Sequence, residues 1–166
     1  MKTKITGRVW VYGDDVNTDV IFPGKYTYSI TDPTEMARHA LEDLDPTFAD
    51  AVQPGDIIVA GSNWGCGSSR EQAVICLKEA GVAAIVARSF ARIYFRNCIN
   101  HALPIVTCDA VDSVETGDEI TIDFEAGTVT TPEATYTFPP LSPEVMEILD
   151  DGGLIPHARK QLGLSG

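Results

Sequence analysis

The segment that most constrains the fold runs from residue 57 to residue 87. Residues 57–60 and 82–87 are short, continuous apolar runs, which is typical of strands buried on both faces of a parallel sheet. The stretch between them has one apolar helical face, formed by Ala73, Cys76, Leu77 and Ala80. Gly81 is placed to end that helix. Parallel strands need a crossover connection, so this strand–loop–helix–strand unit predicts an α/β fold.

The remaining segments predict further strands and helices around this unit. We expect strands at 5–11, 103–106, 119–124, 128–130 and 134–138, and helices at 33–44, 89–97 and 143–149. The strand at 119–124 alternates, and after a turn at 125–127 the strand at 128–130 returns as a hairpin. No repeat or low-complexity linker divides the chain, and 166 residues suit one sizeable core. The prediction is one domain over residues 1–166, with an antiparallel annex.

Charge and hydropathy exclude several classes of partner. Lys and Arg number 12 against 24 Asp and Glu, for a net charge of -12, which disfavours nucleic acid and anionic lipid. No apolar run approaches the length of a transmembrane helix. The first residues show no apolar signal region. We therefore expect a cytoplasmic protein that contacts neither membrane nor nucleic acid.

The cysteines do not indicate a metal site in this chain. Cys66, Cys76, Cys98 and Cys108 include no CxxC pair and match neither zinc-ribbon nor ferredoxin spacing. Cys76 and Cys98 lie in apolar helical patterns and are predicted to be core residues. We expect no metal ligand here.

The glycine-rich loop, residues 61–73, is the most informative stretch for function. Ser68 and Glu71 have the spacing of a capping box, so a helix is expected to begin at Ser68 or Ser69. A helix N-terminus and Arg70 would both attract an anion. The Gly-Lys-Ser/Thr ending of a Walker loop is absent, so a small carboxylate is favoured over a nucleotide phosphate. The same field would favour a serine alkoxide.

Five segments carry a resemblance to a known family. They are 13–19 (GDDVNTD), 23–26 (PGKY), 54–59 (PGDIIV), 65–71 (GCGSSRE) and 89–97 (SFARIYFRN). Together they resemble the mobile domain of the aconitase superfamily and, more closely, the small subunits of 3-isopropylmalate dehydratases. The likeness covers nearly all of residues 5–157 and implies the swivelling β/β/α domain.

The resemblance implies a reaction and a division of labour between two chains. The family dehydrates a 2-hydroxy dicarboxylic acid and rehydrates it with the hydroxyl on the neighbouring carbon. It implies a [4Fe-4S] cluster held by a separate large subunit, in a heterodimer or heterotetramer, and no cofactor in this chain. Ser68 matches the serine that abstracts the carbon-bound proton. Ser69 and Arg70, beside Gly67, match residues that hold a substrate carboxylate, and Asp19 lies in a loop that resembles one lining the same cleft.

The loop at 25–31 is expected to select the substrate. In the family, the segment after Pro-Gly-Lys/Arg-Tyr reads the variable substituent, and relatives acting on homocitrate-type acids tend to carry an arginine there. This loop has no arginine but contains Lys25, Tyr26, Tyr28 and Ile30. An apolar pocket suits isopropyl better than a further carboxylate, although the tyrosines also fit ordinary loop packing. We therefore favour 2-isopropylmalate, an intermediate of leucine biosynthesis.

Alternatives stay open at this stage. The same chemistry could act on homocitrate-type acids, citramalate or 2,3-dimethylmalate. A different class of protein, a carboxylate-binding module without chemistry, would need the loop amides and Arg70 but not the serine pair. Arg88, Arg92 and Arg96 lie on one helical face and are predicted to pair with acidic residues or with the partner subunit.

Overall fold

The computed structural model describes residues 3–163. Within them the strands form a seven-stranded sheet in the order β4-β3-β2-β1-β5-β6-β7. The strands are β1 (Lys4–Val11), β2 (Ile57–Ala60), β3 (Ala84–Ala87), β4 (Ile105–Thr107), β5 (Glu119–Asp123), β6 (Thr128–Thr130) and β7 (Thr135–Thr137). The helices are α1 (Thr18–Ile21), α2 (Pro33–Arg38), α3 (Phe48–Ala51), α4 (Gln72–Glu79), α5 (Arg92–Asn100), α6 (Pro143–Asp150) and α7 (Leu154–Gln161), with 3-10 turns η1 (Gly24–Tyr26) and η2 (Ala110–Ser113).

Strand β1 joins a parallel sheet to an antiparallel one. Its C-terminal part pairs in parallel with β2, with Val9 opposite Ile57, while its N-terminal part pairs antiparallel with β5. Strands β2, β3 and β4 continue in parallel, and every residue of β2 and β3 is buried. Burial on both faces explains why these two strands are continuous apolar runs in the sequence.

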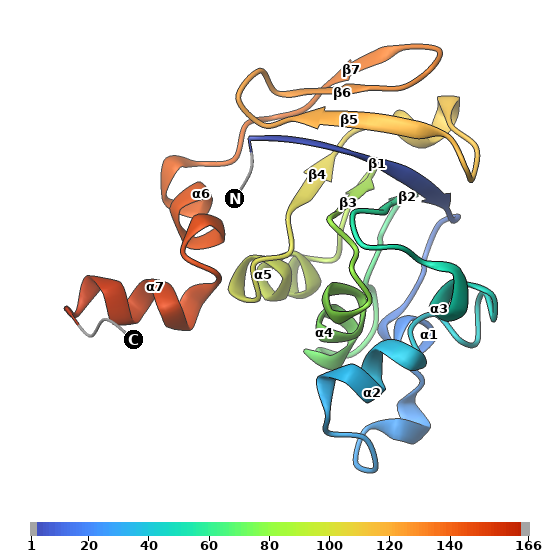
Figure 1. The fold of residues 1–166 in the computed structure, drawn as a ribbon, viewed down its shortest axis with the longest axis vertical. Helices are drawn as coiled ribbons and strands as arrows, with labels where there is room; N and C mark the ends of the chain where they lie inside the picture. The colour runs from blue at the N-terminus through green and yellow to red at the C-terminus, as the bar shows by residue number, and fades with distance from the viewer. Residues whose placement is uncertain (1–2, 164–166) are drawn as a thin grey trace.

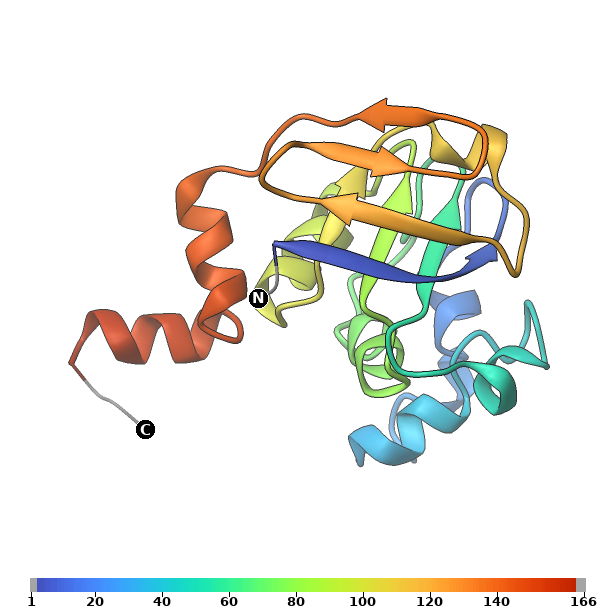
Figure 2. The ribbon, with the colours of Figure 1, turned by 45° about the horizontal axis from the view of Figure 1, so that its top comes forward.

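The two faces of the parallel strands pack against different layers. Ile58 and Ile85 belong to the core shared with α4 and α5, whereas Ile57 and Val86 belong to a second core shared with β5 and β6. Figure 1 shows β2, β3 and β4 between the helices α4 and α5 below and β5–β7 above. Figure 2 shows the antiparallel strands as a separate layer. The chain therefore has the predicted β/β/α architecture with an antiparallel annex.

Several boundaries differ from the sequence prediction for tertiary reasons. The helix predicted over 33–44 ends at Arg38, and turns follow it. Leu41 is fully buried with a φ of 57°, and its N–H donates to the carbonyl of Ile21 at 2.8 Å. That positive φ is incompatible with a continuing α-helix. Asp32, the N-cap residue of α2, makes no side-chain cap bond. The short helices α1 and α3, and α7, lie in segments for which no helix was predicted.

Candidate active site

The loop between β2 and α4 is held in place by the polar segment that follows β1. Asp14 accepts a 2.7 Å hydrogen bond through Oδ1 from the Ser62 amide. The amide of Thr18 donates to the Cys66 carbonyl at 2.9 Å, and its hydroxyl donates to the Ser68 carbonyl at 2.8 Å. The segment at 13–19 thus fixes the backbone that carries Ser68.

Two glycines in the loop are required by its geometry. Gly65 has a φ of 82°, and a Cβ there would lie 2.2 Å from Cγ of Tyr94 on α5. Gly67 has a φ of 95°, which strains any residue with a Cβ, although its surroundings leave ordinary contact space. Gly65 therefore allows the loop to approach α5, and Gly67 allows the chain to turn into Ser68.

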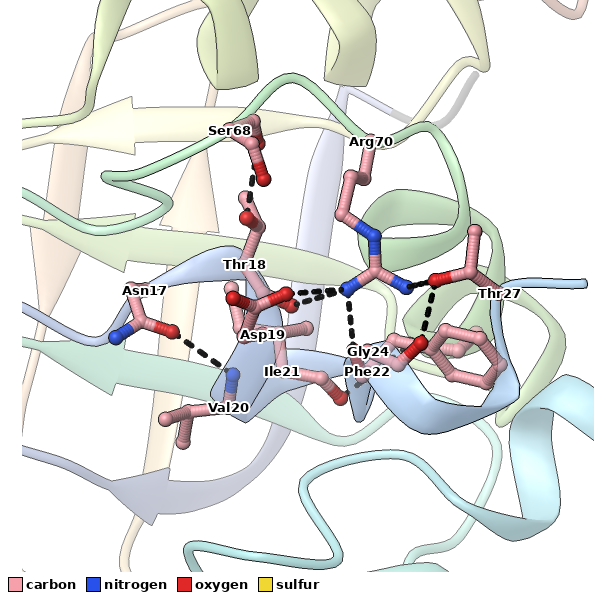
Figure 3. A network of polar contacts seen from close by, with 11 residues as sticks. Asn17, Thr18, Asp19, Val20, Ile21, Phe22, Gly24, Thr27, Ser68 and Arg70 are labelled. Carbon is pink, nitrogen blue, oxygen red and sulfur yellow. Dashed lines mark hydrogen bonds and ion pairs between the residues drawn. The ribbon is translucent and has the colours of Figure 1, made fainter.

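Arg70 joins the glycine-rich loop at 61–73, called the serine loop below, to the segment that precedes the loop at 25–31, called the substrate loop below (Figure 3). Its Nη1 donates to Asp19 Oδ1 at 3.1 Å and to the carbonyls of Phe22 at 2.6 Å and Thr18 at 3.3 Å. Its Nη2 donates to the Thr27 hydroxyl at 2.7 Å. The Arg70 side chain is 10% exposed, against 67% for Asp19. The predicted role of Arg70 in holding a carboxylate remains a prediction, because both terminal nitrogens have protein partners here.

The helix after the loop begins later than predicted. Helix α4 starts at Gln72, and its N-cap Glu71 makes no side-chain cap bond. The expected start at Ser68 or Ser69 and the capping box are therefore wrong. The cause is tertiary: the Ser68 carbonyl accepts from Thr18, and Arg70 reaches away to the neighbouring segment. The two serines precede α4 and do not lie in its first turn.

A pocket of about 290 Å³ lies between the serine loop and the first turn of α5. Its lining residues are Thr18, Gly65, Gly67, Ser68, Ser69, Arg70, Ala91, Arg92, Ile93, Tyr94 and Asn97. The loop follows β2 and α5 follows β3, so both lie at the carboxyl edge of adjacent parallel strands, where open α/β sheets bind ligands. The amide of Trp64 donates to the Ser89 carbonyl, and the Ala91 amide returns a bond to Trp64.

These two bonds also explain where α5 begins. They hold residues 89–91 in bridge-like pairing with the serine loop, so the helix predicted over 89–97 covers Arg92–Asn100 instead. The buried hydroxyl of Tyr94 donates to the Ala73 carbonyl at 2.8 Å and ties α5 to α4. The sequence analysis did not predict that Thr18, Tyr94 and Asn97 line the pocket or that Thr27 bonds Arg70. Contacts between segments far apart in the sequence leave no periodic pattern.

The substrate-loop residues lie outside this pocket. The Tyr26 hydroxyl donates to Glu42 at 3.0 Å, and its ring lies 4.2 Å from that of His39. Lys25 Nζ lies 3.9 Å from the same carboxylate. The hydrogen bond from His39, with those neighbours, lowers the pKa of Glu42. Ile30 packs on the main core, and Tyr28 is 95% exposed. Tyr26 and Ile30 thus take part in loop packing, and Tyr28 is free to meet a ligand or partner.

The cysteines differ in how deeply they are buried. Cys76, Cys98 and Cys108 are buried free thiols whose pKa values are raised by burial, and Cys66 is half-buried. Within residues 3–163, the group of side chains with a geometry that could bind a metal ion consists of Glu147, Asp151 and His157 and includes no cysteine. Lys160 Nζ lies 3.1 Å from Asp151 Oδ1, so this cluster forms an ion-pair network.

The arginine prediction is partly confirmed. Arg88 pairs with Asp112 and lies 3.9 Å from Asp109. Arg92 and Arg96 form no ion pair with any described residue. No helix in the described part of the chain is long and apolar enough to cross a membrane.

Comparison with known proteins places this geometry in a family. The family model of the aconitase C-terminal domain matches residues 17–110. The 3-isopropylmalate dehydratase small subunit 1 of Archaeoglobus fulgidus is 47% identical over 155 residues, which cover 92% of this chain and 96% of that protein. The chain belongs to the family of 3-isopropylmalate dehydratase small subunits. The resemblance stated from the sequence is thereby confirmed.

Two further relatives of this family define its breadth. A crystal structure described as 3-isopropylmalate dehydratase from Methanocaldococcus jannaschii superposes with a TM-score of 0.91 at 41% identity, covering 97% of this chain and 96% of that one. A methanogen homoaconitase small subunit of Methanothermobacter thermautotrophicus is 48% identical over 172 residues, covering 100% of this chain and 98% of that protein. The family fold is therefore shared by chains named for two different substrates.

Proposed function

We propose that this chain is the small subunit of a heteromeric hydro-lyase that isomerises 2-isopropylmalate to 3-isopropylmalate in leucine biosynthesis. The observation that carries the proposal is the composition of the serine pocket. It is lined by Ser68, Ser69 and two arginines and by no acidic side chain, although the chain carries a net charge of -12. A positive, serine-bearing pocket on an acidic protein fits a dicarboxylate substrate.

In this proposal Ser68 is the general base. A proton on carbon beside a carboxylate is weakly acidic, so its removal needs a base and stabilisation of the developing charge. The pocket arginines favour a serine alkoxide and the negative charge that develops on the substrate. Ser69 and Gly67 lie beside Ser68 on the wall and are proposed to contact a carboxylate. The proton stays on Ser68 Oγ until it is returned in the hydration step.

Removal of the substrate hydroxyl is assigned to the partner subunit. The cysteines of this chain are not gathered into a cluster-binding set within residues 3–163. We therefore propose that the [4Fe-4S] cluster belongs to a large subunit, where it supplies Lewis acidity toward the leaving hydroxide. The stoichiometry, heterodimer or heterotetramer, and the cytoplasmic location remain predictions.

The substrate assignment depends on the loop at 25–31. It contains no arginine for a third carboxylate, and Lys25 lies beside Glu42. The exposed ring of Tyr28 offers an apolar surface to an isopropyl group once the partner covers it. A homoaconitase activity is the second candidate, supported by the 48% identity to a chain of that name.

An anaerobic turnover assay tests the proposal. This chain is mixed with the cluster-loaded large subunit from the same source and offered 2-isopropylmalate, homocitrate, citramalate and 2,3-dimethylmalate. We expect 2-isopropylmalate to be preferred, and only when both chains are present. Preference for homocitrate would contradict the substrate assignment, and absence of turnover with an intact cluster would contradict the enzymatic function.

A further inference from the structure

The helix end that faces the pocket is that of α5, which has nine residues. Its N-cap is Ala91, which offers no side-chain oxygen, and its first residues Arg92, Ile93 and Tyr94 all line the pocket. The first amides of a helix have no intrahelical acceptor. They are normally satisfied by a capping side chain, water or a ligand, and among residues 3–163 no side chain caps this end of α5.

A buried amide side chain on the same helix also lacks a partner. Asn97 is 9% exposed and lines the pocket, and its side chain makes no hydrogen bond with any described residue. Helical side chains lean toward the N-terminus, which directs Asn97 toward the first turn of α5. Buried polar side chains are nearly always hydrogen-bonded. A nine-tenths buried side-chain amide that has no protein partner in the described chain and lies beside an uncapped helix end therefore points to a polar ligand.

The electrostatics of the pocket favour an anionic ligand. Arg70 is engaged by Asp19 and by the Thr27 hydroxyl. Arg92, on the opposite wall, has no ion-pair partner in the described chain. The uncompensated positive charge of the pocket thus lies on the α5 side, together with the helix end.

We propose that the first turn of α5, with Asn97 and Arg92, binds a carboxylate of the substrate and presents its neighbouring carbon to Ser68. The inference rests on the proposed function and deepens it. Asn97 donates through Nδ2 to one carboxylate oxygen, the free amides of α5 donate to the other, and Arg92 supplies the counter-charge.

The test uses the assembled enzyme with equal cluster content and three variants on α5. Asn97→Leu removes the hydrogen bonds at similar volume, and Asn97→Asp places a negative charge beside the carboxylate. Asn100→Leu is the matched control, because Asn100 lies on the same helix and does not line the pocket. We expect KM to rise about tenfold in Asn97→Leu and about a hundredfold in Asn97→Asp, and to change less than twofold in Asn100→Leu.

A second readout separates substrate binding from a structural role. Because Asn97 has no partner among the described residues, Asn97→Leu should keep the melting temperature of the wild-type chain. Unchanged KM in both Asn97 variants, or a rise in KM that follows a lower melting temperature, would contradict the inference while the wild-type turnover still supports the proposed function. Absence of turnover in the wild-type assembly would overturn both.

Arg92 is tested separately, because the partner subunit could also supply its counter-ion. Arg92→Gln should raise KM for the substrate, while Arg96→Gln, one turn further and outside the pocket, should not. If Arg92→Gln instead weakens subunit association and leaves KM unchanged, Arg92 belongs to the interface and the counter-charge part of the proposal is wrong.

Discussion

Arg70 Nη1 and Asp19 Oδ1 lie 3.1 Å apart, and this pair connects the serine loop with the segment that leads into the substrate loop. The same guanidinium bonds the hydroxyl of Thr27 within that loop. Thr27 in turn donates to the Gly24 carbonyl at 2.8 Å. The proposed base and the proposed specificity loop are thus joined through one arginine, which gives the first prediction.

Thr27→Val removes the hydroxyl that accepts from Arg70 while keeping the shape of the side chain. We expect the free energy of unfolding to fall by about 1 kcal/mol. We also expect kcat/KM for the preferred acid to fall several-fold, because the loop loses its link to Arg70. Urea unfolding and steady-state kinetics measure the two effects. Thr31→Val, at an exposed position of the same loop, is the control; equal behaviour of the two variants would refute the link.

Gly65→Ala tests the close approach of the serine loop to α5. A Cβ at this position would lie 2.2 Å from Tyr94 Cγ, and the backbone φ of 82° adds strain. We expect a loss of roughly 2–4 kcal/mol in the free energy of unfolding. Gly13→Ala is the matched control, because a Cβ there meets nothing within 4 Å. A Gly65→Ala variant as stable as Gly13→Ala would show that the loop and the helix do not approach this closely.

The buried carboxylate of Asp56 should make the stability of the fold depend on pH in acid. It is 4% exposed, and burial alone would raise its pKa. The Gln53 amide, the Trp10 indole and Arg8 all donate to Oδ2, at 2.9, 2.9 and 3.1 Å, and together hold the pKa below its usual value. The pKa of Asp56 is therefore lower in the folded chain than in the unfolded chain, where it is about 3.9. The ionised carboxylate stabilises the fold above that pH, and this stabilisation is lost as the pH falls through the folded-state pKa.

Asp56→Asn should therefore lower the free energy of unfolding by about 2 kcal/mol near neutral pH. The difference from wild type should shrink as the pH falls below about 4, because the unfolded wild-type chain then takes up a proton at Asp56 that the folded chain still excludes. Urea unfolding across this pH range measures the difference. Asp43→Asn, at an exposed aspartate with no ion pair in the described chain, should show no such trend. A constant difference across the range would contradict the assignment.

The sequence predicted those parts of the fold in which pattern and packing agree. The run at 57–60 is a buried strand, and the run predicted over 82–87 contains the buried strand Ala84–Ala87. Cys76 and Cys98 are core residues, and the late hairpin strands form the annex. In each case a helical apolar face, a period of two or a continuous apolar run reflects the burial that the fold provides. These elements bring the serine loop to the carboxyl edge of the sheet.

The sequence could not predict where tertiary contacts override local signals. Ser68 and Glu71 have the spacing of a capping box, but the hydrogen bond from the Thr18 hydroxyl to the Ser68 carbonyl keeps Ser68 outside α4. Leu41 ends a good helical pattern by pairing with Ile21. The wall opposite Ser68 was missed for a different reason, since in the sequence Asn97 looks like any polar residue of an amphipathic helix.

The central claim is that Ser68 removes the carbon-bound proton. The most direct measurement is kcat and KM of Ser68→Ala for 2-isopropylmalate, in the assembled enzyme with cluster content equal to wild type. Ser62→Ala, on the same loop but outside the pocket lining, is the control. We predict that Ser68→Ala lowers kcat about 10³-fold with KM within a few-fold, while Ser62→Ala stays near wild type. A kcat for Ser68→Ala within tenfold of wild type would contradict the account.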